Sequence, residues 1–280
     1  MNKTTKIMTA AVILACLAVI GTVILYFAGK ADRMELSSAD KRTVSSDQTK
    51  QKTEKKTTQK EKTERRYVIV IDPGHQRKQD ASQEPIGPGA KETKPKVSSG
   101  TSGVVSGLDE YELTLMVSNK LRTELIKRGY TVHMTRIRAD VNISNAERAK
   151  FAEDKGADIF IRIHANGSED HTVRGALSMA PSKNNPYAAK LAEKSQKLSR
   201  SVLDEYCRVT GMKNRGVILT DQMSGINWAS MPVTILEMGF MSNQKDDLAM
   251  KNKKFQKKMA EGTADGIDRY FKEMETEEGR

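Results

Sequence analysis

The sequence predicts a three-layer α/β domain, with a mostly parallel twisted sheet flanked by helices and an N-terminal transmembrane helix before it. Three apolar runs support the sheet: VIVI at residues 68–71, ADIFIRI at 157–163 and PVTIL at 232–236. Continuous runs of β-favouring residues are typical of strands buried on both faces, as in parallel sheets. Stretches with helical spacing lie between these runs, which is the alternation expected of an α/β fold.

Composition narrows the class of function. The chain of 280 residues has a formal net charge of +11, but aromatic residues make up only 5% of it. No basic helix or aromatic-studded strand is present, so we expect no nucleic-acid partner. The positive charge suits attraction to an anionic lipid or cell-wall polymer.

The N-terminal region has the features of a membrane anchor. Residues 8–28 are almost uninterrupted apolar, with lysines before them and basic residues after them. A signal peptide has an apolar region of about 7–15 residues, whereas a membrane-spanning helix needs roughly 20. We therefore expect a short cytoplasmic tail at residues 1–7 and an uncleaved signal anchor at residues 8–29. The protein would then be a single-pass protein of the cell membrane with its folded domain outside; cleavage and secretion to the cell wall is the alternative.

A polar segment separates this anchor from the domain. Residues 30–66 are rich in Ser, Thr, Lys, Gln, Asp and Glu, so they cannot bury enough apolar surface to fold, and we expect a flexible charged linker. The domain is predicted to occupy residues 67–273, followed by an acidic tail at 274–280 that frays. The two cysteines are Cys16 and Cys207. With Cys16 in the anchor, the domain has no internal disulfide, which favours a bacterial surface protein.

The first predicted strand ends at a proline and a glycine, which places His75 just past its carboxyl end. In open α/β sheets, ligands bind at that edge. Residues 76–107 follow with glycines, prolines and serines but no sustained period. Loops of this length are uncommon in compact domains and tend to be functional, so we expect this one to wall one side of a site.

A helix comes next, predicted by Leu113, Val117, Leu121 and Leu125 at four-residue spacing and ending at Gly129. Glu110 lies in its first turn, where the helix dipole favours an ionised carboxylate. A capping role for Glu110 is the alternative to a functional one. Asp109 and Glu112 are alternative candidates for a functional carboxylate, and spacing alone does not choose among the three residues.

Arg148 is a candidate for binding an anionic substrate group. It follows a predicted strand at residues 130–135 and lies on a helix that begins with a capping box, Ser144 to Glu147. A structural ion pair is the alternative role for Arg148. The remaining elements are a long helix that starts at Asn185-Pro186, a loop at residues 211–232 beside the site, and a closing helix with Phe255, Met259 and Ile267 on one side.

Two imidazoles and a carboxylate thus follow three neighbouring strands: His75, His164 and Glu237. Such a set with an open fourth position is frequent in catalytic zinc sites, where zinc lowers the pKa of water and polarises a carbonyl. A separate base must take the proton of the water. With Glu110 and Glu237 both available, three ligands and one base are present, but two structural histidines are the alternative.

Four blocks of the sequence resemble the zinc-dependent N-acetylmuramoyl-L-alanine amidases of the amidase 3 family. They are VIVIDPGH at 68–75, GLDE at 107–110 leading into LTL, IRIHAN at 161–166 and PVTILEMGFMSN at 232–243. The resemblance covers residues 67–271. It implies that His75, Glu110 and His164 are the Zn²⁺ ligands and that Glu237 is the catalytic glutamate. Arg162 departs from the small residue that the family often has there, which would alter the rim of the site.

The resemblance further implies a peptidoglycan hydrolase that cleaves the amide between N-acetylmuramic acid and L-alanine of the stem peptide. We expect Asn166 and Arg148 to contact this substrate, and peptidoglycan and the bacterial membrane to be the partners. Two alternatives are a zinc peptidase that cuts within the stem peptide and a non-catalytic wall-binding protein on an amidase scaffold. The oligomeric state has no signal in the sequence.

Overall fold

The computed structural model describes residues 67–279. The predicted cytoplasmic tail, transmembrane segment (8–29) and charged linker (30–66) lie outside the described residues. Within residues 67–279, no helix is both long enough and apolar enough to cross a membrane.

A six-stranded sheet forms the centre of the described region, with the strand order β4-β1-β5-β8-β6-β7. Neighbouring strands are parallel except for the pair β6 and β8. The strands are β1 (Val68–Pro73), β4 (Thr131–Met134), β5 (Ile159–Asn166), β6 (Ala176–Ala180), β7 (Asn214–Leu219) and β8 (Val233–Phe240). The predicted mostly parallel sheet is confirmed, and β1, β5 and β8 are its adjacent central strands.

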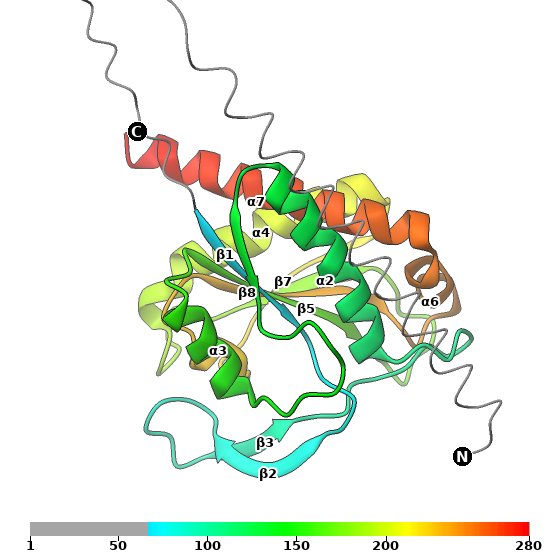
Figure 1. The fold of residues 1–280 in the computed structure, drawn as a ribbon, viewed down its shortest axis with the longest axis horizontal. Helices are drawn as coiled ribbons and strands as arrows, with labels where there is room; N and C mark the ends of the chain where they lie inside the picture. The colour runs from blue at the N-terminus through cyan, green and yellow to red at the C-terminus, as the bar shows by residue number, and fades with distance from the viewer. Residues whose placement is uncertain (1–66, 280) are drawn as a thin grey trace, which may run out of the picture. The chain divides into compact units, whose positions relative to one another are not determined.

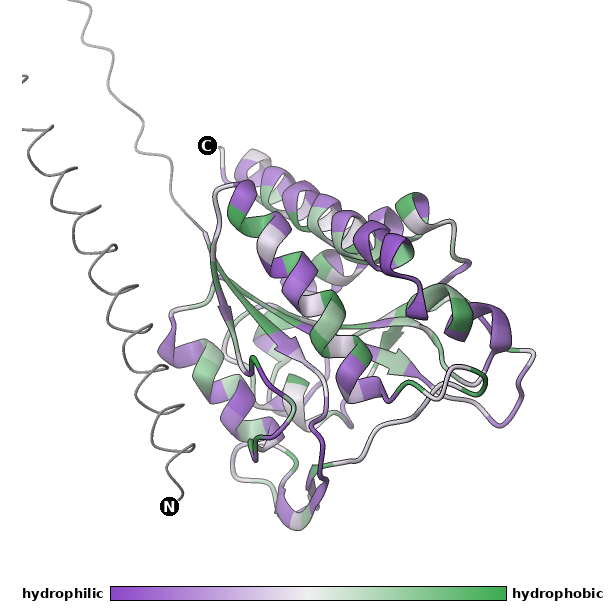
Figure 2. Ribbon diagram, turned by 45° about the vertical axis from the view of Figure 1, so that its right-hand side comes forward, coloured by the Kyte–Doolittle hydropathy of each residue, from purple (hydrophilic) through white to green (hydrophobic). Residues whose placement is uncertain are grey.

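Helices cover both faces of this sheet (Figure 1). One face packs against α2 (Glu110–Lys127), α4 (Ala192–Thr210) and α7 (Lys253–Glu277), and the opposite face against α3 (Asn145–Asp154) and α5 (Ser224–Asn227). Two further helices, η1 (Ala189–Leu191) and α6 (Gln244–Lys251), complete the set in residues 67–279. Hydrophobic residues run along the central strands, whereas the helices carry both hydrophobic and hydrophilic residues (Figure 2). This is the three-layer arrangement that the alternation of strands and helices predicts.

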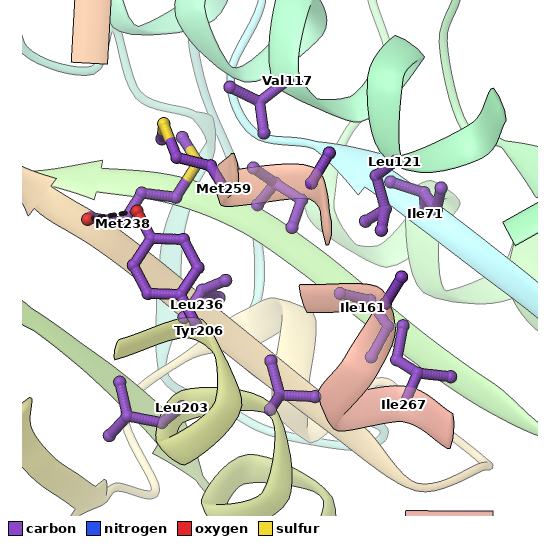
Figure 3. Close-up of a cluster of buried hydrophobic side chains, with 14 of the residues drawn as sticks. Ile71, Val117, Leu121, Ile161, Leu203, Tyr206, Leu236, Met238, Met259 and Ile267 are labelled. Atoms are coloured by element: carbon purple, nitrogen blue, oxygen red, sulfur yellow. Dashed lines mark hydrogen bonds between the residues drawn. The ribbon is translucent and has the colours of Figure 1, made fainter. Parts of the chain in front are cut away.

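The larger hydrophobic core lies between the sheet and the helices α2, α4 and α7 (Figure 3). The side chains at its centre come from all three helices and three strands: Ile71, Val117, Leu121, Ile161, Leu203, Leu236, Met259 and Ile267. The Tyr206 hydroxyl donates a hydrogen bond to the Met238 carbonyl at 2.7 Å, so this polar group is satisfied inside the core. These side-chain contacts hold β1, β5 and β8 against the three helices.

Two segments predicted to be loops contain strands. The β2–β3 hairpin (Asp80–Pro85 and Thr93–Val97) lies within residues 76–107, and β7 lies within residues 211–232. The hairpin strands are mostly polar, so they lack the periodicity that predicts a strand. Tertiary contacts hold the hairpin instead: the Trp228 indole donates to the Pro85 carbonyl at 2.9 Å.

The C-terminal helix is longer than the sequence predicts. The acidic segment from residue 274 was expected to fray, but α7 continues to Glu277. The Lys197 ammonium lies 2.6 Å from the Glu277 carboxylate and 3.7 Å from that of Glu273. Because these ion pairs join the last turns of α7 to α4, the expectation of fraying is wrong for residues 274–277. The long helix predicted from Asn185 also begins later, since Ala192 is the first residue of α4.

Candidate active site

The carboxyl ends of β1, β5 and β8 meet at one edge of the sheet. His164 on β5 pairs in register with Glu237 on β8, and Arg162 pairs with Asp72 on β1. His75 follows β1 after one glycine. The prediction that these segments are neighbouring strands is therefore confirmed. Both β5 and β8 continue two or three residues beyond His164 and Glu237, so these side chains lie within the strands and not past their ends.

Three side chains converge at this edge: His75, Glu110 and His164. The His75 Nε2 atom lies 3.0 Å from Glu110 Oε1 and 3.1 Å from His164 Nδ1, and the His164 Nδ1 atom lies 3.2 Å from Glu110 Oε1. Zinc bonds of about 2.0–2.2 Å in a tetrahedron separate the ligand atoms by roughly 3.3–3.6 Å. The three atoms therefore have nearly the separation that a single zinc ion requires.

The proton positions on His75 also fit a cation. Its Nδ1 atom lies 3.0 Å from the Ser98 carbonyl, which only accepts hydrogen bonds, so Nδ1 carries the proton in the neutral ring. The Nε2 atom then presents a lone pair to the Glu110 carboxylate. Two acceptors 3.0 Å apart need a cation between them, either a second proton on the imidazole or a metal ion, and the donor set fits a metal ion.

Backbone geometry brings the loops close to this cluster. His75 has a φ of 59°, the left-handed conformation that non-glycine residues rarely adopt and that is common at functional sites. A Cβ atom at Gly74 would overlap the His164 ring. At Gly100, where φ is 79°, a Cβ atom would lie 2.9 Å from Glu110 Oε2 and 3.0 Å from His75 Cγ. Glycine is required at both positions because the backbone packs directly against the three side chains.

Glu110 is the first residue of α2, and its side chain is buried. Backbone amides hold both carboxylate oxygens: Ala165 donates to Oε1 and Thr101 to Oε2, each at 3.0 Å. Burial acts to raise the pKa of Glu110, but the hydrogen bonds and charges of His164 and His75 outweigh it and lower the pKa. The carboxylate is therefore ionised, and it accepts hydrogen bonds from Thr101 and from Ala165 on β5 and not from the first turn of α2, contrary to the capping alternative.

Burial also acts on the His164 imidazole. It lowers the pKa of His164 to about 4, with the Glu110 hydrogen bond opposing the shift. His164 is then neutral at pH 7, which is the form that binds a metal. Its Nε2 atom is buried and has no hydrogen-bond partner among residues 67–279.

Glu237 lies beside the cluster without joining it. Its Oε2 atom is buried and has no hydrogen-bond partner in the described part of the chain. Burial raises the pKa of Glu237 to about 8, Glu110 adds to the rise and Arg162 opposes it. A carboxyl group with a pKa in this range takes up and releases protons near neutral pH, which suits a general base.

A pocket of about 300 Å³ opens beside these side chains. His75, His164 and Glu237 line it, and β3 forms one wall through Lys94, Pro95 and Val97. The prediction that residues 76–107 wall one side of the site is confirmed. The N-terminal end of α5, including Gly225, forms another part of the lining.

The two predicted substrate-binding residues have different positions. Arg148 is 1% exposed, and its guanidinium donates to Asp72 Oδ1 at 2.8 Å and to the carbonyls of Pro73 and His75 at 3.0 Å. The expectation of a substrate contact is wrong for Arg148 because these groups occupy its donors, and the alternative of a structural ion pair holds. Asn166 is the last residue of β5 and accepts a hydrogen bond from the Gly167 amide at 2.8 Å. Its role stays a prediction.

The sequence analysis expected Arg162 to alter only the rim of the site, whereas the structure makes it a buried residue of the pocket lining. Its Nε atom donates to Asp72 Oδ2 at 2.9 Å and its Nη2 atom to Asn145 Oδ1 at 2.7 Å. The unusual arginine before Ile163-His164 was a signal, but a strand position does not say what a long side chain reaches. The Ser98 carbonyl, which orients His75, left no signal because any residue type supplies it.

Comparisons with known proteins agree with this geometry. A family model described as N-acetylmuramoyl-L-alanine amidase matches residues 69–269. The N-acetylmuramoyl-L-alanine amidase AmiC of Neisseria meningitidis is 25% identical over 245 residues, which cover 74% of this chain and 53% of AmiC. The amidase LytC of Bacillus subtilis is 27% identical over 205 residues, covering 73% of this chain and 36% of LytC. The chain thus spans about half, or less, of these curated relatives.

Solved structures of N-acetylmuramoyl-L-alanine amidases have a similar fold. The amidase Ami1 of Mycobacterium smegmatis superimposes with a TM-score of 0.66 at 25% identity, covering 73% of this chain and 96% of Ami1. The catalytic domain of the amidase CwlV of Paenibacillus polymyxa has a TM-score of 0.56 at 26% identity, covering 74% of this chain and 98% of that domain. The match therefore includes nearly the whole of each solved domain.

Proposed function

Because the chain belongs to the amidase 3 family of N-acetylmuramoyl-L-alanine amidases, we propose that it hydrolyses the amide between N-acetylmuramic acid and L-alanine in peptidoglycan. The observation that carries this proposal is the convergence of His75, Glu110 and His164 beside a separate carboxyl group, Glu237. The arrangement supplies three ligands for one Zn²⁺ ion, and Glu237 can act as the base because it is not one of these ligands.

Zinc held by these three residues would lower the pKa of a water molecule and polarise the scissile carbonyl. The Ser98 carbonyl fixes the tautomer of His75, and the Ala165 and Thr101 amides hold the Glu110 carboxylate in place. Such supporting contacts orient the ligands and strengthen metal binding. The chain thus provides a pre-arranged ligand set.

Glu237 moves the proton in this proposal. Its carboxylate accepts a proton from the attacking water as the oxygen bonds to the amide carbon, and it then donates that proton to the departing alanine nitrogen. The C–N bond breaks, the lactyl carboxylate remains on the muramic acid and the stem peptide leaves with a free amino group. The elevated pKa of Glu237 suits both halves of this transfer.

The experiment is a digest of purified peptidoglycan with the full-length protein, in detergent and with zinc, followed by mass spectrometry. The proposal requires release of intact stem peptides that begin with a free L-alanine amino terminus. Fragments cut inside the stem would favour the stem-peptidase alternative. Binding of peptidoglycan without any product would favour the non-catalytic wall-binding alternative.

Membrane attachment forms a second part of the proposal. The apolar run at residues 8–29 would anchor the protein, and the charged segment at 30–66 would let the domain reach the wall from the outer face of the membrane. Fractionation of cells that produce the protein tests this. Recovery of the intact chain in the membrane fraction supports the anchor, and a shortened chain in the wall or medium contradicts it.

A further inference from the structure

Arg162 presents a fixed cation to the pocket beside the candidate metal ligands. The residue is 4% exposed and lines the pocket together with His164 and Glu237. Asp72 and Asn145 accept hydrogen bonds from its Nε and Nη2 atoms, which fixes the plane of the guanidinium. Its Nη1 atom has no hydrogen-bond acceptor among the described residues, so the N–H groups at this edge of the guanidinium are left for a ligand.

The surroundings of Arg162 hold more positive than negative charge. Asp72 is its one ion-pair partner in residues 67–279, and Asp72 also pairs with Arg148. A third buried guanidinium, Arg136, donates to the neighbouring Pro73 carbonyl and makes no ion pair within residues 67–279. Lys94 adds another cation to the pocket lining, where Glu237 is the one acidic side chain. Buried charge of one sign that lacks a partner is costly unless a ligand supplies the opposite charge.

Gly225 makes room for this arrangement. A Cβ atom at this position would overlap the Nη1 and Cζ atoms of Arg162, so only glycine lets the start of α5 lie against the guanidinium. The arginine on β5 and the glycine on α5 therefore fit each other. Both residues line the pocket, and their contact fixes the position of the guanidinium in the pocket wall.

We propose that Arg162 is a substrate-specificity residue that binds a carboxylate of the stem peptide, assisted by the charge of Lys94. The inference rests on the proposed amidase function. The muramic acid lactyl carboxyl is consumed in the scissile amide and the remaining glycan groups are neutral, so the peptide is the part of the substrate that brings carboxylates. Arginine suits such a group because its planar fork donates charge-assisted hydrogen bonds.

Strand geometry sets which stem residue is bound. Arg162 lies two positions before His164 on β5, on the same face, which corresponds to roughly 6.6 Å along the strand. An extended peptide advances about 3.3–3.6 Å per residue, so the carboxylate of the second stem residue lies roughly 7 Å from the scissile carbonyl. The residue after L-alanine, a glutamate in the test below, keeps a free α-carboxylate when the stem continues through its side-chain carboxyl, and that α-carboxylate is the group that we assign to Arg162.

The test compares two substrates that differ in this group alone. They are N-acetylmuramoyl-L-alanyl-glutamates with the glutamate α-carboxylate free or converted to the amide. The full-length zinc-loaded protein should cleave the free acid with a kcat/KM at least about tenfold higher, as expected for a charge-assisted hydrogen bond. Calorimetry on the Glu237→Gln protein, which should bind without cleaving, gives the same comparison as a ratio of Kd values.

Variants then test which residues produce the preference for the free acid over the amide. Arg162→Gln should reduce the ratio to near one, Arg162→Lys should retain part of it, and Lys94→Gln should lower it by a smaller factor. Lys96→Gln is the matched control, because Lys96 lies on the same strand outside the pocket lining and should leave the ratio unchanged. If Arg162→Gln does not fold, the wild-type ratio and Lys94→Gln still decide the question.

Equal kcat/KM and equal Kd for the two substrates in the wild-type chain would overturn the inference, as would an unchanged ratio in a folded Arg162→Gln protein. Failure of the proposed function looks different. In that case neither substrate is cleaved, while the Kd ratio still reports on Arg162.

Discussion

His164 and Glu237 occupy paired positions on the adjacent parallel strands β5 and β8. Neighbouring strands lie about 4.7–4.9 Å apart, and paired residues in a parallel sheet point to the same face. The Glu237 carboxyl is therefore held next to a candidate metal ligand but outside the His75, Glu110 and His164 cluster. The two carboxyl groups of the site therefore have separate tasks. Glu110 is positioned to bind the metal ion, and Glu237 remains available to carry a proton.

The separation predicts different outcomes for the two glutamates. Glu237→Gln should reduce hydrolysis of muropeptides by at least about 100-fold, the usual range for loss of a general base, while zinc content stays near one equivalent. Glu110→Gln should lose both activity and zinc, because it removes a charged ligand. Product release measured by mass spectrometry and metal content measured by plasma emission check both statements. Loss of zinc from the Glu237→Gln protein would mean that the two roles are assigned to the wrong residues.

Gly100 and Gly89 provide a matched pair for testing the loop that packs on the site. Both have positive φ, 79° and 75°, so alanine strains the backbone at each position by roughly 1–2 kcal/mol. Nothing lies within 4 Å of a Cβ atom at Gly89, whereas a Cβ atom at Gly100 meets the Glu110 carboxylate and the His75 ring. Gly100→Ala should therefore weaken zinc binding by about tenfold or more, and Gly89→Ala should leave it unchanged. Equal zinc affinities, measured by competition with a chelating dye, would show that the loop does not control the site.

Arg148 should contribute to stability and not to substrate affinity. Replacement by Gln removes one of two guanidinium partners of the buried Asp72, and breaking a buried pair typically costs about 3–5 kcal/mol. We expect the free energy of unfolding in urea to fall by roughly that amount, with KM within about twofold of wild type at a temperature where the variant is folded. Lys150→Gln on the exposed side of α3 is the control and should change neither quantity. Full stability with a raised KM would restore the substrate-binding role for Arg148.

The sequence predicted the parts of the fold that follow from periodicity. The apolar runs ending near His75, His164 and Glu237 became adjacent parallel strands, and Leu113, Val117, Leu121 and Leu125 became buried residues of α2. The hairpin β2–β3 could not be predicted, because its polar strands are held by tertiary contacts such as that of Trp228. Periodicity is a local property, so it is silent about elements that other parts of the chain stabilise.

The sequence predicted which residues form the candidate site better than it predicted where their side chains point. Residues at strand ends meet wherever the strands are adjacent, so His75, His164 and Glu237 could be grouped from the sequence. Glu110 could be selected among its acidic neighbours only through the family resemblance, since a helix start does not fix where a carboxylate points. The directions of Arg148 and Arg162 were open for the same reason: each side chain reaches Asp72, which is distant in sequence.

The raised pKa of Glu237 predicts a pH-dependent stability of the metal-free protein. Burial shifts this pKa from 4.5 to about 8, so as pH rises the unfolded chain releases the proton first. The stability that the protonated carboxyl provides is therefore complete below about pH 4.5 and is lost as pH rises to about 8. At 1.36 kcal/mol per pKa unit, the loss between pH 5 and pH 8.5 is on the order of 3–4 kcal/mol.

Glu237→Gln removes this titration while keeping the size of the side chain. In urea unfolding of the metal-free proteins, the variant should gain stability relative to wild type by that amount between pH 5 and pH 8.5. His164 and the other titrating groups are common to both proteins, so the difference reports on Glu237. Zinc should shrink the difference, because a nearby divalent cation favours the ionised carboxylate. If the two metal-free proteins keep a constant difference across this range, the Glu237 carboxyl is not held in its protonated form by burial.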